Sequence, residues 1–550
     1  MIAEFLDRRY PWVIGALGLW YAVIQLLYVS TMPLVMDEFA GAEAVHRLTA
    51  GIPYRDFVPY KTVLGYYLQL PALLLGSDSW SMTICVKYEM VLINTACLLG
   101  ASALLARHFR RAAVALGLLL LVCMSTFLER SSDLRVDMLT AWFGLFSMLA
   151  LLRRRACVAG LLAGASFLVS QKGAYYMLAG GLALGVYWLC AERSRRRLID
   201  AAAFTACALA PVLLYLAAFE LLGRAAGSVS SQVVTAHSAV VFDNLYPTVR
   251  KYWFQTVERN PFFYGAMLLA LGRAFGARHG GFREWLLWVY GGTIIAGCVW
   301  HRQPWPYFFV ILVPTAWVLI ASLFDGELRR AGRFSVPLLL VMALIGVGWP
   351  LRRVPVVLER DQGAQRNAVR LVEAITEGDE KYLAGVDMVL GRRQPGGLAW
   401  LDRARLGRVK KAGGKAVINR LEEDPPKALI MNYRLHALPR PVKSYFAANY
   451  RRLHGNVHVY CPTLPASKSE WYVPFDGDYR VRQSGKKAPA SVFVDGEEVR
   501  RGRVLELWKG GVPYESERDF RLCLEPAGWE EIADPAWAKS VRMFHRPYDY

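Results

Sequence analysis

Long uncharged apolar segments are the feature that most restricts how this chain can fold. The first runs from Pro11 to Ser30 without a charged side chain, and a helix of that length crosses a hydrocarbon core of about 30 Å. No small-residue cleavage site follows it, so we interpret it as a retained span rather than a signal peptide. Further apolar segments lie at 83–106, 113–128, 137–152, 156–171, 174–190, 200–222, 262–276, 284–300, 306–324 and 335–351.

These segments predict a polytopic α-helical membrane protein with about eleven transmembrane helices. Hydrophobic residues make up 55% of the 550 residues, which exceeds the about 45–50% of soluble domains. Segments 156–171 and 174–190 are short and are separated by Gln171-Lys172-Gly173. We expect a tight hairpin there, which leaves the count open by one or two.

The positive charges are distributed unevenly. The formal net charge is +20, which would suit either nucleic-acid binding or the excess of Lys and Arg in cytoplasmic loops. Alternate loops contain the arginines, which favours the membrane interpretation and predicts a cytoplasmic amino terminus, an exported tail after about residue 352 and no nucleic-acid partner. The arginines concerned are Arg8, Arg9, Arg107, Arg110, Arg111, Arg153, Arg154, Arg155, Arg193, Arg195, Arg196, Arg197, Arg273, Arg278, Arg283, Arg329, Arg330 and Arg333.

The tail has the pattern of a water-soluble domain. The sequence predicts an amphipathic helix over Gln365–Thr376 and a buried strand over Lys427–Asn432. Residues Ser491–Trp508 alternate around Asp495-Gly496, which is typical of a hairpin. We therefore expect a transmembrane domain over 1–351, an exported α/β segment over 352–469 and an exported β-rich module over 470–550.

Two of the nine cysteines, Cys461 and Cys523, lie in the expected exported part. In an oxidising compartment they can form a disulfide. The alternative is a pair of buried thiols, and the sequence leaves both open.

Carboxylates near the ends of apolar segments are candidates for function, because a charge at membrane depth costs at least about 2.5 kcal/mol. Asp37 and Glu38 follow the first span, and Asp133 and Asp137 precede the fourth. We expect Asp133 and Asp137 to share a helix face, with Asp137 directed toward the surface that contains Asp37. The alternative is a set of ordinary interfacial carboxylates favoured by helix dipoles.

Cations and tyrosines occur in loops that the topology places on the same outer side. A turn contains Tyr54 and Arg55, followed by Lys61, and Lys172 lies between two short spans. The sequence HRQPWPY contains Arg302 and Tyr307. Cations that converge at one interface suit a phosphate group, although snorkelling lysines and an interfacial aromatic belt are the alternative.

Together these groups suggest transfer of a sugar from a lipid phosphate. The carboxylates would activate a hydroxyl nucleophile, and the cations would stabilise the departing phosphate. Two other classes stay open: a transporter or flippase of lipid-linked glycans, and a non-enzymatic cell-envelope assembly protein.

The motifs resemble those of GT-C glycosyltransferases that use polyprenyl-phosphate sugars, especially family 39 protein mannosyltransferase-like enzymes and lipid A aminoarabinose transferases. The matching stretches are MDEF, GIPYRDF with GYY, RVDMLTAWF, SQKGAYY and HRQPWPYFFVILVP, in family order over about residues 30–325. The tail is similar to bacterial members through GLAWLDRAR, KALIMNYRLHALP and SYFAANY, and the module around VFVDGEEV resembles small β-sandwich additions.

The resemblance implies roles for individual residues. Asp37 matches the catalytic base, Glu38 its partner and Asp137 the second acidic residue. Phosphate-facing groups are implied at Lys61, Lys172, Arg302 and Tyr307. In the aminoarabinose enzymes a glutamate precedes the loop lysine and helps to bind a metal, whereas Tyr60 stands here. A divalent metal therefore stays an open expectation, with His237 and Asp243 of the loop 223–261 as further candidate ligands.

The implied reaction is a single inverting displacement on the extracytoplasmic face. A hexosyl or pentosyl group would pass from a polyprenyl phosphate to a hydroxyl of a glycan, lipid or protein. The tail favours a multi-pass protein of the bacterial inner membrane, whose lipid would be undecaprenyl phosphate.

Overall fold

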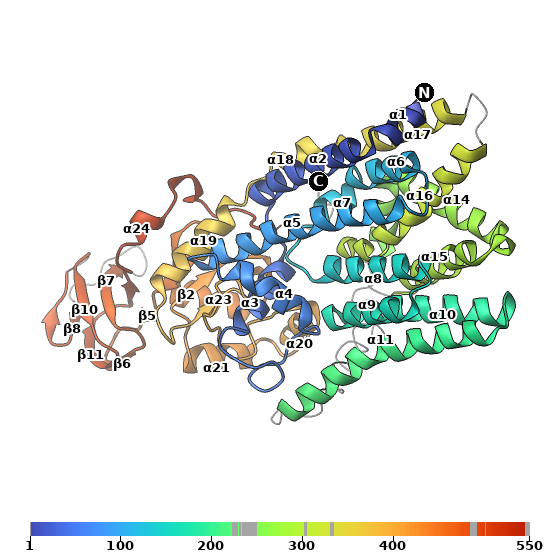
Figure 1. The fold of residues 1–550 in the computed structure, drawn as a ribbon. Helices are drawn as coiled ribbons and strands as arrows, with labels where there is room; N and C mark the ends of the chain where they lie inside the picture. Colours follow the sequence, from blue (N-terminus) through green and yellow to red (C-terminus); the bar gives the residue numbers. More distant parts are fainter. Residues whose placement is uncertain are drawn as a thin grey trace.

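The computed structural model describes residues 2–222, 229, 233, 250–301, 305–330, 335–483, 492–500 and 502–544. Figure 1 shows long helices in one part of the molecule and β-strands at the opposite end. Short helices and a small sheet lie between them.

Each apolar segment expected to span the membrane is helical over most of its length. The segment 113–128 is divided into two helices at Cys123-Met124, and 306–324 begins as a 3-10 turn. The long helical part comprises α1 Ile2–Arg8, α2 Tyr10–Thr31, α5 Ser79–Leu105, α6 Arg111–Val122, α8 Asp137–Leu152, α9 Ala156–Val169, α10 Ala174–Cys190, α11 Arg195–Leu222, α14 Pro261–Gly276, α15 Phe282–Trp300, α16 Val313–Arg330 and α17 Ser335–Leu351.

Length and composition identify four of the described helices as able to cross a membrane: Tyr10–Thr31, Ser79–Leu105, Gln171–Cys190 and Arg195–Leu222. Three shorter helices, α6, α8 and α9, are also apolar. The chain therefore has the apolar helices of an integral membrane protein. The expected count of about eleven spans is higher than this measure gives for the described helices.

The arginine-containing loops, which are every second loop between the long helices, lie near one another at one end of the helical part. The Arg110 backbone N–H donates to Asp325 at 2.9 Å. The Arg283 guanidinium lies 5.7 Å from the Phe109 ring centroid, and that of Arg154 lies 4.7 Å from the Phe282 ring centroid. These loops therefore share one side of the bundle, as their charge pattern predicts.

Short elements occupy the other end of the helical part. They are α3 Met36–Arg47, α4 Leu64–Leu73, α7 Ser125–Arg130, η1 Gln171–Gly173, α13 Arg250–Arg259 and η3 Pro306–Ile311. Asp37 and Glu38 lie in α3, Lys172 lies in η1 and Tyr307 lies in η3, whereas Asp137 is the first residue of α8 and Lys61 precedes α4.

The α/β part is built on a sheet with strand order β1-β2-β4-β3. The expected helix is α19 Gly363–Ile375, and the expected buried strand is β2 Ala428–Ile430. The remaining elements are α18 Val354–Leu358, β1 Tyr382–Leu383, α20 Arg403–Lys411, α21 Lys415–Glu423, α22 Tyr433–His436, α23 Arg440–Asn449, β3 Tyr450–His454 and β4 Val457–Tyr460.

Two further four-stranded sheets pack face to face around a shared apolar core, with strand orders β10-β7-β12-β5 and β6-β11-β8-β9. Their strands are β5 Thr463–Leu464, β6 Ser467–Val473, β7 Gly477–Gln483, β8 Val492–Val494, β9 Glu497–Glu498, β10 Val504–Leu507, β11 Gly510–Ser516 and β12 Phe520–Leu524. After β12 the chain returns to the α/β part through α24 Trp529–Ile532 and η4 Pro535–Trp537.

The expected hairpin forms between β8 and β9, where Val494 pairs with Glu497. Asp495 and Gly496 both have positive φ, 52° and 78°, as the two-residue turn requires. The hairpin is shorter than the alternating segment suggests, because β10 pairs with β7 in the other sheet.

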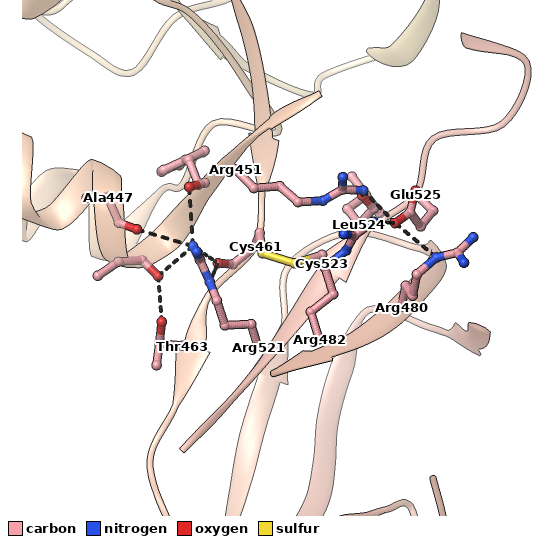
Figure 2. Close-up of a disulfide and its surroundings, with 12 residues drawn as sticks. Ala447, Arg451, Cys461, Thr463, Arg480, Arg482, Arg521, Cys523, Leu524 and Glu525 are labelled. Atoms are coloured by element: carbon pink, nitrogen blue, oxygen red, sulfur yellow. Dashed lines mark hydrogen bonds and ion pairs between the residues drawn. A yellow bond between two sulfur atoms is a disulfide. The ribbon is translucent and has the colours of Figure 1, made fainter. Parts of the chain in front are cut away.

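A disulfide joins Cys461, which follows β4, to Cys523 in β12 (Figure 2). It covalently links the α/β part to the β-rich part. Beside it, the Arg521 guanidinium donates to backbone carbonyls that end α23 and β4, including Cys461 O at 2.7 Å and Ala448 O at 3.1 Å.

Candidate functional site

Helix α3 presents two adjacent carboxylates in its first turn. Val35 is extended, so the helix begins at Met36 and places Asp37 and Glu38 among the free N–H groups of its amino terminus. The helix dipole favours negative charge at this position. The two side chains nevertheless have different surroundings.

Glu38 is buried, with 1% of its surface exposed. Its carboxylate accepts from Lys87 Nζ at 2.7 Å, from the Leu134 N–H at 3.0 Å and from the Val35 N–H at 2.7 Å. Glu38 therefore joins α3 to α5 and to the segment that precedes α8. All of these contacts are within the protein, which suits a residue that holds Asp37 in place.

Asp37 is the more accessible carboxylate, with 36% of its side chain exposed. It forms an ion pair with the Arg135 guanidinium. That guanidinium also donates through Nε to Asp137 at 3.0 Å and lies 3.5 Å from the centroid of the Tyr307 ring. Arg135 thus connects two carboxylates and stacks on an aromatic face.

Asp137 is the centre of the buried charge cluster. Its carboxylate accepts from Lys172 Nζ at 2.8 Å, from Lys61 Nζ at 3.1 Å and from Arg135. Only 2% of its side chain is exposed, and both lysine side chains are below 9%. The structure therefore brings together four residues singled out from sequence, Asp37, Asp137, Lys61 and Lys172, with Tyr307 beside them.

The expectation that Asp133 and Asp137 share a helix face is wrong. Helix α8 begins at Asp137, and residues 131–136 form turns. Asp133 consequently points elsewhere and lies 3.6 Å from Arg130. The i,i+4 rule applies only within a helix, so it could not relate a residue that precedes the helix to its first residue.

The cluster has more positive than negative charge. Lys61, Lys172 and Arg135 face two carboxylates, Asp37 and Asp137. Burial, together with the neighbouring cations Arg135 and Lys172, lowers the pKa of Lys61 to about 7, whereas Asp137 opposes the shift. An added anion would relieve the repulsion among the three cations.

Arg135 is the residue that sequence reasoning missed. It lies between two acids in Asp133-Leu134-Arg135-Val136-Asp137, of which the sequence pattern marks only the two carboxylates as candidates for function. A cation among acids at the start of an apolar segment is itself expensive in a membrane. That signal could have identified it.

Two of the proposed substrate-binding residues make their described contacts outside the cluster. Tyr54 is 2% exposed and shares a 2.7 Å hydrogen bond with Tyr215. Arg55 forms a surface ion pair with Asp56 at 2.9 Å. Arg302, His237 and Asp243 lie outside the described residues.

The described residues do not fit a metal site. Among them, no group of three or more His, Cys, Asp or Glu side chains is arranged to hold a metal ion. Every oxygen of Asp137 faces a cation, and Tyr60 occupies the position where a glutamate ligand is implied.

Comparison with known proteins gives a relationship through structure rather than sequence. No family model and no curated protein matches the sequence. The crystal structure of ArnT from Cupriavidus metallidurans bound to undecaprenyl phosphate superimposes with a TM-score of 0.58 at 13% identity, covering 81% of this chain and 97% of ArnT. The apo form of ArnT superimposes with a TM-score of 0.52 at 15% identity, covering 79% and 93%.

The match extends over most of both chains. This chain therefore has the fold of ArnT, in agreement with the resemblance to GT-C glycosyltransferases.

Proposed function

We propose that this chain is an integral membrane glycosyltransferase that uses a sugar attached to a polyprenyl phosphate. One observation carries the proposal: an accessible carboxylate, Asp37, is joined through Arg135 to a buried carboxylate that holds Lys61 and Lys172. The proposed base and the proposed phosphate-binding cations thus belong to one network of ion pairs. The undecaprenyl phosphate named for the ArnT structure supports a lipid-phosphate ligand.

In the proposed reaction, Asp37 accepts the proton of an acceptor hydroxyl. The hydroxyl oxygen forms a bond to the anomeric carbon as the bond from that carbon to the phosphate oxygen breaks, with inversion. The electron pair stays on the lipid phosphate, so no general acid is required. This differs from glycoside hydrolysis, in which a carboxylic acid protonates the leaving oxygen.

The cations stabilise the charge that develops on the phosphate. Lys61 and Lys172 fill this role, with Arg302 added from the resemblance and Tyr307 facing the phosphate. Asp137 keeps the lysine ammonium groups oriented, and Glu38 holds the turn that contains Asp37. Tyr54 and Arg55 belong to the loop that contains Lys61, and we assign them to substrate binding outside the charge cluster.

The proposed orientation places the site and the tail on the extracytoplasmic face of a bacterial inner membrane, with the amino terminus in the cytoplasm. The arginine-containing loops at the opposite end of the bundle support it. The acceptor is a hydroxyl of a glycan, lipid or protein, and nucleic acid is no partner.

The test uses the full chain in detergent with a panel of radiolabelled polyprenyl-phosphate sugars. Loss of sugar from the lipid is followed for the wild type, Asp37→Asn and Lys61→Ala. Turnover by the wild type that disappears in Asp37→Asn would support the proposal. Absence of both turnover and lipid-phosphate binding across the panel would overturn it and favour a transporter, a flippase or an assembly protein.

A further inference from the structure

The connection between α2 and α3 determines where Asp37 lies, and this connection is not helical. The chain is extended from Met32 to Val35. Leu34 is 1% exposed, so its backbone N–H and C=O need partners inside the protein. Neighbouring helical residues cannot supply them.

One side chain of the exported part satisfies both groups. The Leu34 N–H donates to Gln365 Oε1 at 2.8 Å, and Gln365 Nε2 donates to Leu34 O at 2.9 Å. Gln365 belongs to α19 and is itself 1% exposed. A single amide thus pairs with this residue as a neighbouring β-strand would.

The same amide also holds a distant segment of the chain. Gln365 Nε2 donates to Met543 O at 2.9 Å. The next residue, Phe544, packs edge-on against Phe39 of α3 with ring centroids 6.1 Å apart. The segment near the carboxyl end of the chain therefore lies against the helix that contains Asp37.

Helix α19 contacts the outer ends of other transmembrane helices along one side. Gln362 Nε2 donates to Ser30 O at 2.7 Å near the end of α2. Glu373 accepts from Ser79 Oγ at 2.6 Å at the start of α5. Through these contacts α19 can hold Leu34 at a fixed position relative to the ends of α2 and α5, beside which it lies (Figure 1).

A second contact fixes the other end of α3. Glu43 Oε2 accepts from the Gly391 N–H at 3.0 Å, and its other oxygen pairs with Arg47 Nε at 2.8 Å. The helix is therefore held before its first turn and again near its last. These contacts from the exported part act on α3 and on the residues before it. Lys61 and Lys172 are instead positioned by residues of the helical part.

We infer that Gln365 is a positioning residue for Asp37, and that the exported α/β part sets the geometry of the catalytic helix. The inference rests on the proposed function for the role of Asp37. Leu34 lies three residues before Asp37, so release of its backbone would displace the base relative to the phosphate-binding lysines. A displacement of about 1 Å can reduce a rate by about 100-fold.

The test compares Gln365→Met with Gln362→Ala in the full chain. Methionine fills about the same volume without these hydrogen bonds, whereas Gln362 immediately precedes α19 and bonds the end of α2 rather than Leu34. We expect Gln365→Met to reduce kcat by about 10- to 100-fold while undecaprenyl phosphate binds within about twofold of the wild type. Gln362→Ala should retain kcat within about threefold.

Hydrogen–deuterium exchange of the peptide that contains Leu34 gives a readout independent of turnover. The Leu34 amide should exchange at least about tenfold faster in Gln365→Met and at the wild-type rate in Gln362→Ala. Gln365→Asn, whose amide is too short to reach, is the milder second variant and should show the same exchange. Unchanged exchange at Leu34 in both Gln365 variants would overturn the inference even if no donor is turned over.

Equal losses of kcat and lipid-phosphate binding would also overturn it, because they would indicate a general structural role. If exchange rises in the variants but the wild type transfers no sugar from any donor, the positioning of α3 by Gln365 is supported and the proposed function fails.

Discussion

Arg135 joins Asp37 to Asp137: its guanidinium pairs with the first carboxylate and donates to the second at 3.0 Å. The two acids come from segments about a hundred residues apart, and the arginine holds them in one network. One carboxylate is accessible and the other is buried among cations. Chemically similar residues therefore receive different roles from their surroundings.

Asp37→Asn should abolish sugar transfer while donor binding persists. The amide has nearly the same shape but cannot accept the acceptor proton, and loss of a general base typically costs about 100- to 10,000-fold. The measurement is release of sugar from the labelled donor. Asp379→Asn is the matched control, because Asp379 is a surface acid paired with Arg393, and it should retain wild-type turnover.

Arg135→Lys should impair transfer although the charge is conserved. A lysine cannot bridge two carboxylates and stack on Tyr307 at the same time, because it lacks the planar fork of the guanidinium. We expect kcat to fall by at least about tenfold, which corresponds to an increase of about 1.4 kcal/mol in the activation free energy. Wild-type kinetics in this variant would contradict the bridging role.

Glu38→Gln should destabilise the protein more than it alters the chemistry. Removing one partner of a buried ion pair leaves Lys87 uncompensated, which costs about 3–5 kcal/mol. Thermal unfolding in detergent should show a lower midpoint for Glu38→Gln. The double variant Glu38→Gln with Lys87→Met should recover part of that loss, and a failure to recover would argue against the pair as the cause.

Binding of the lipid donor should weaken as pH rises through about 7. Burial lowers the pKa of Lys61 to about 7, so the ammonium cation is present below this pH and is lost above it. A polyprenyl-phosphate sugar is a phosphodiester with one charge throughout, so the dependence reports on the protein. Lys61→Arg should remove most of the dependence between pH 6 and pH 8.5, since arginine stays protonated. An unchanged profile in Lys61→Arg would assign the dependence to another group.

Loss of the Cys461–Cys523 disulfide should lower the stability of the α/β and β-rich parts that it joins. The bond closes a loop with a sequence separation of 62, and such a crosslink stabilises by about 2–4 kcal/mol. Cys461→Ser with Cys523→Ser should therefore unfold at lower temperature. Cys157→Ser, which alters an exposed free cysteine, is the control and should unfold like the wild type.

Hydrophobic periodicity and charge placement determined much of the architecture. The apolar segments became helices, the arginine-containing loops lie at one end, and α19, β2 and the β8–β9 hairpin form near their expected positions. These features follow from local pattern: an uncharged segment of sufficient length buries its backbone in a helix, and Asp-Gly favours a tight turn. The number of spans was less secure, because segments such as 113–128 break within themselves.

The sequence by itself determined which charged residues were candidates, since a charge beside an apolar segment is costly wherever it lies. Only the tertiary structure decided their relationships. It buries Glu38 and leaves Asp37 accessible, and it begins α8 at Asp137, so that Asp133 lies outside the helix. It also introduced Arg135 as a bridge and revealed Gln365 as the partner of Leu34. The physical reason is that these roles depend on contacts between residues far apart in the chain, and local pattern contains no information about such distances.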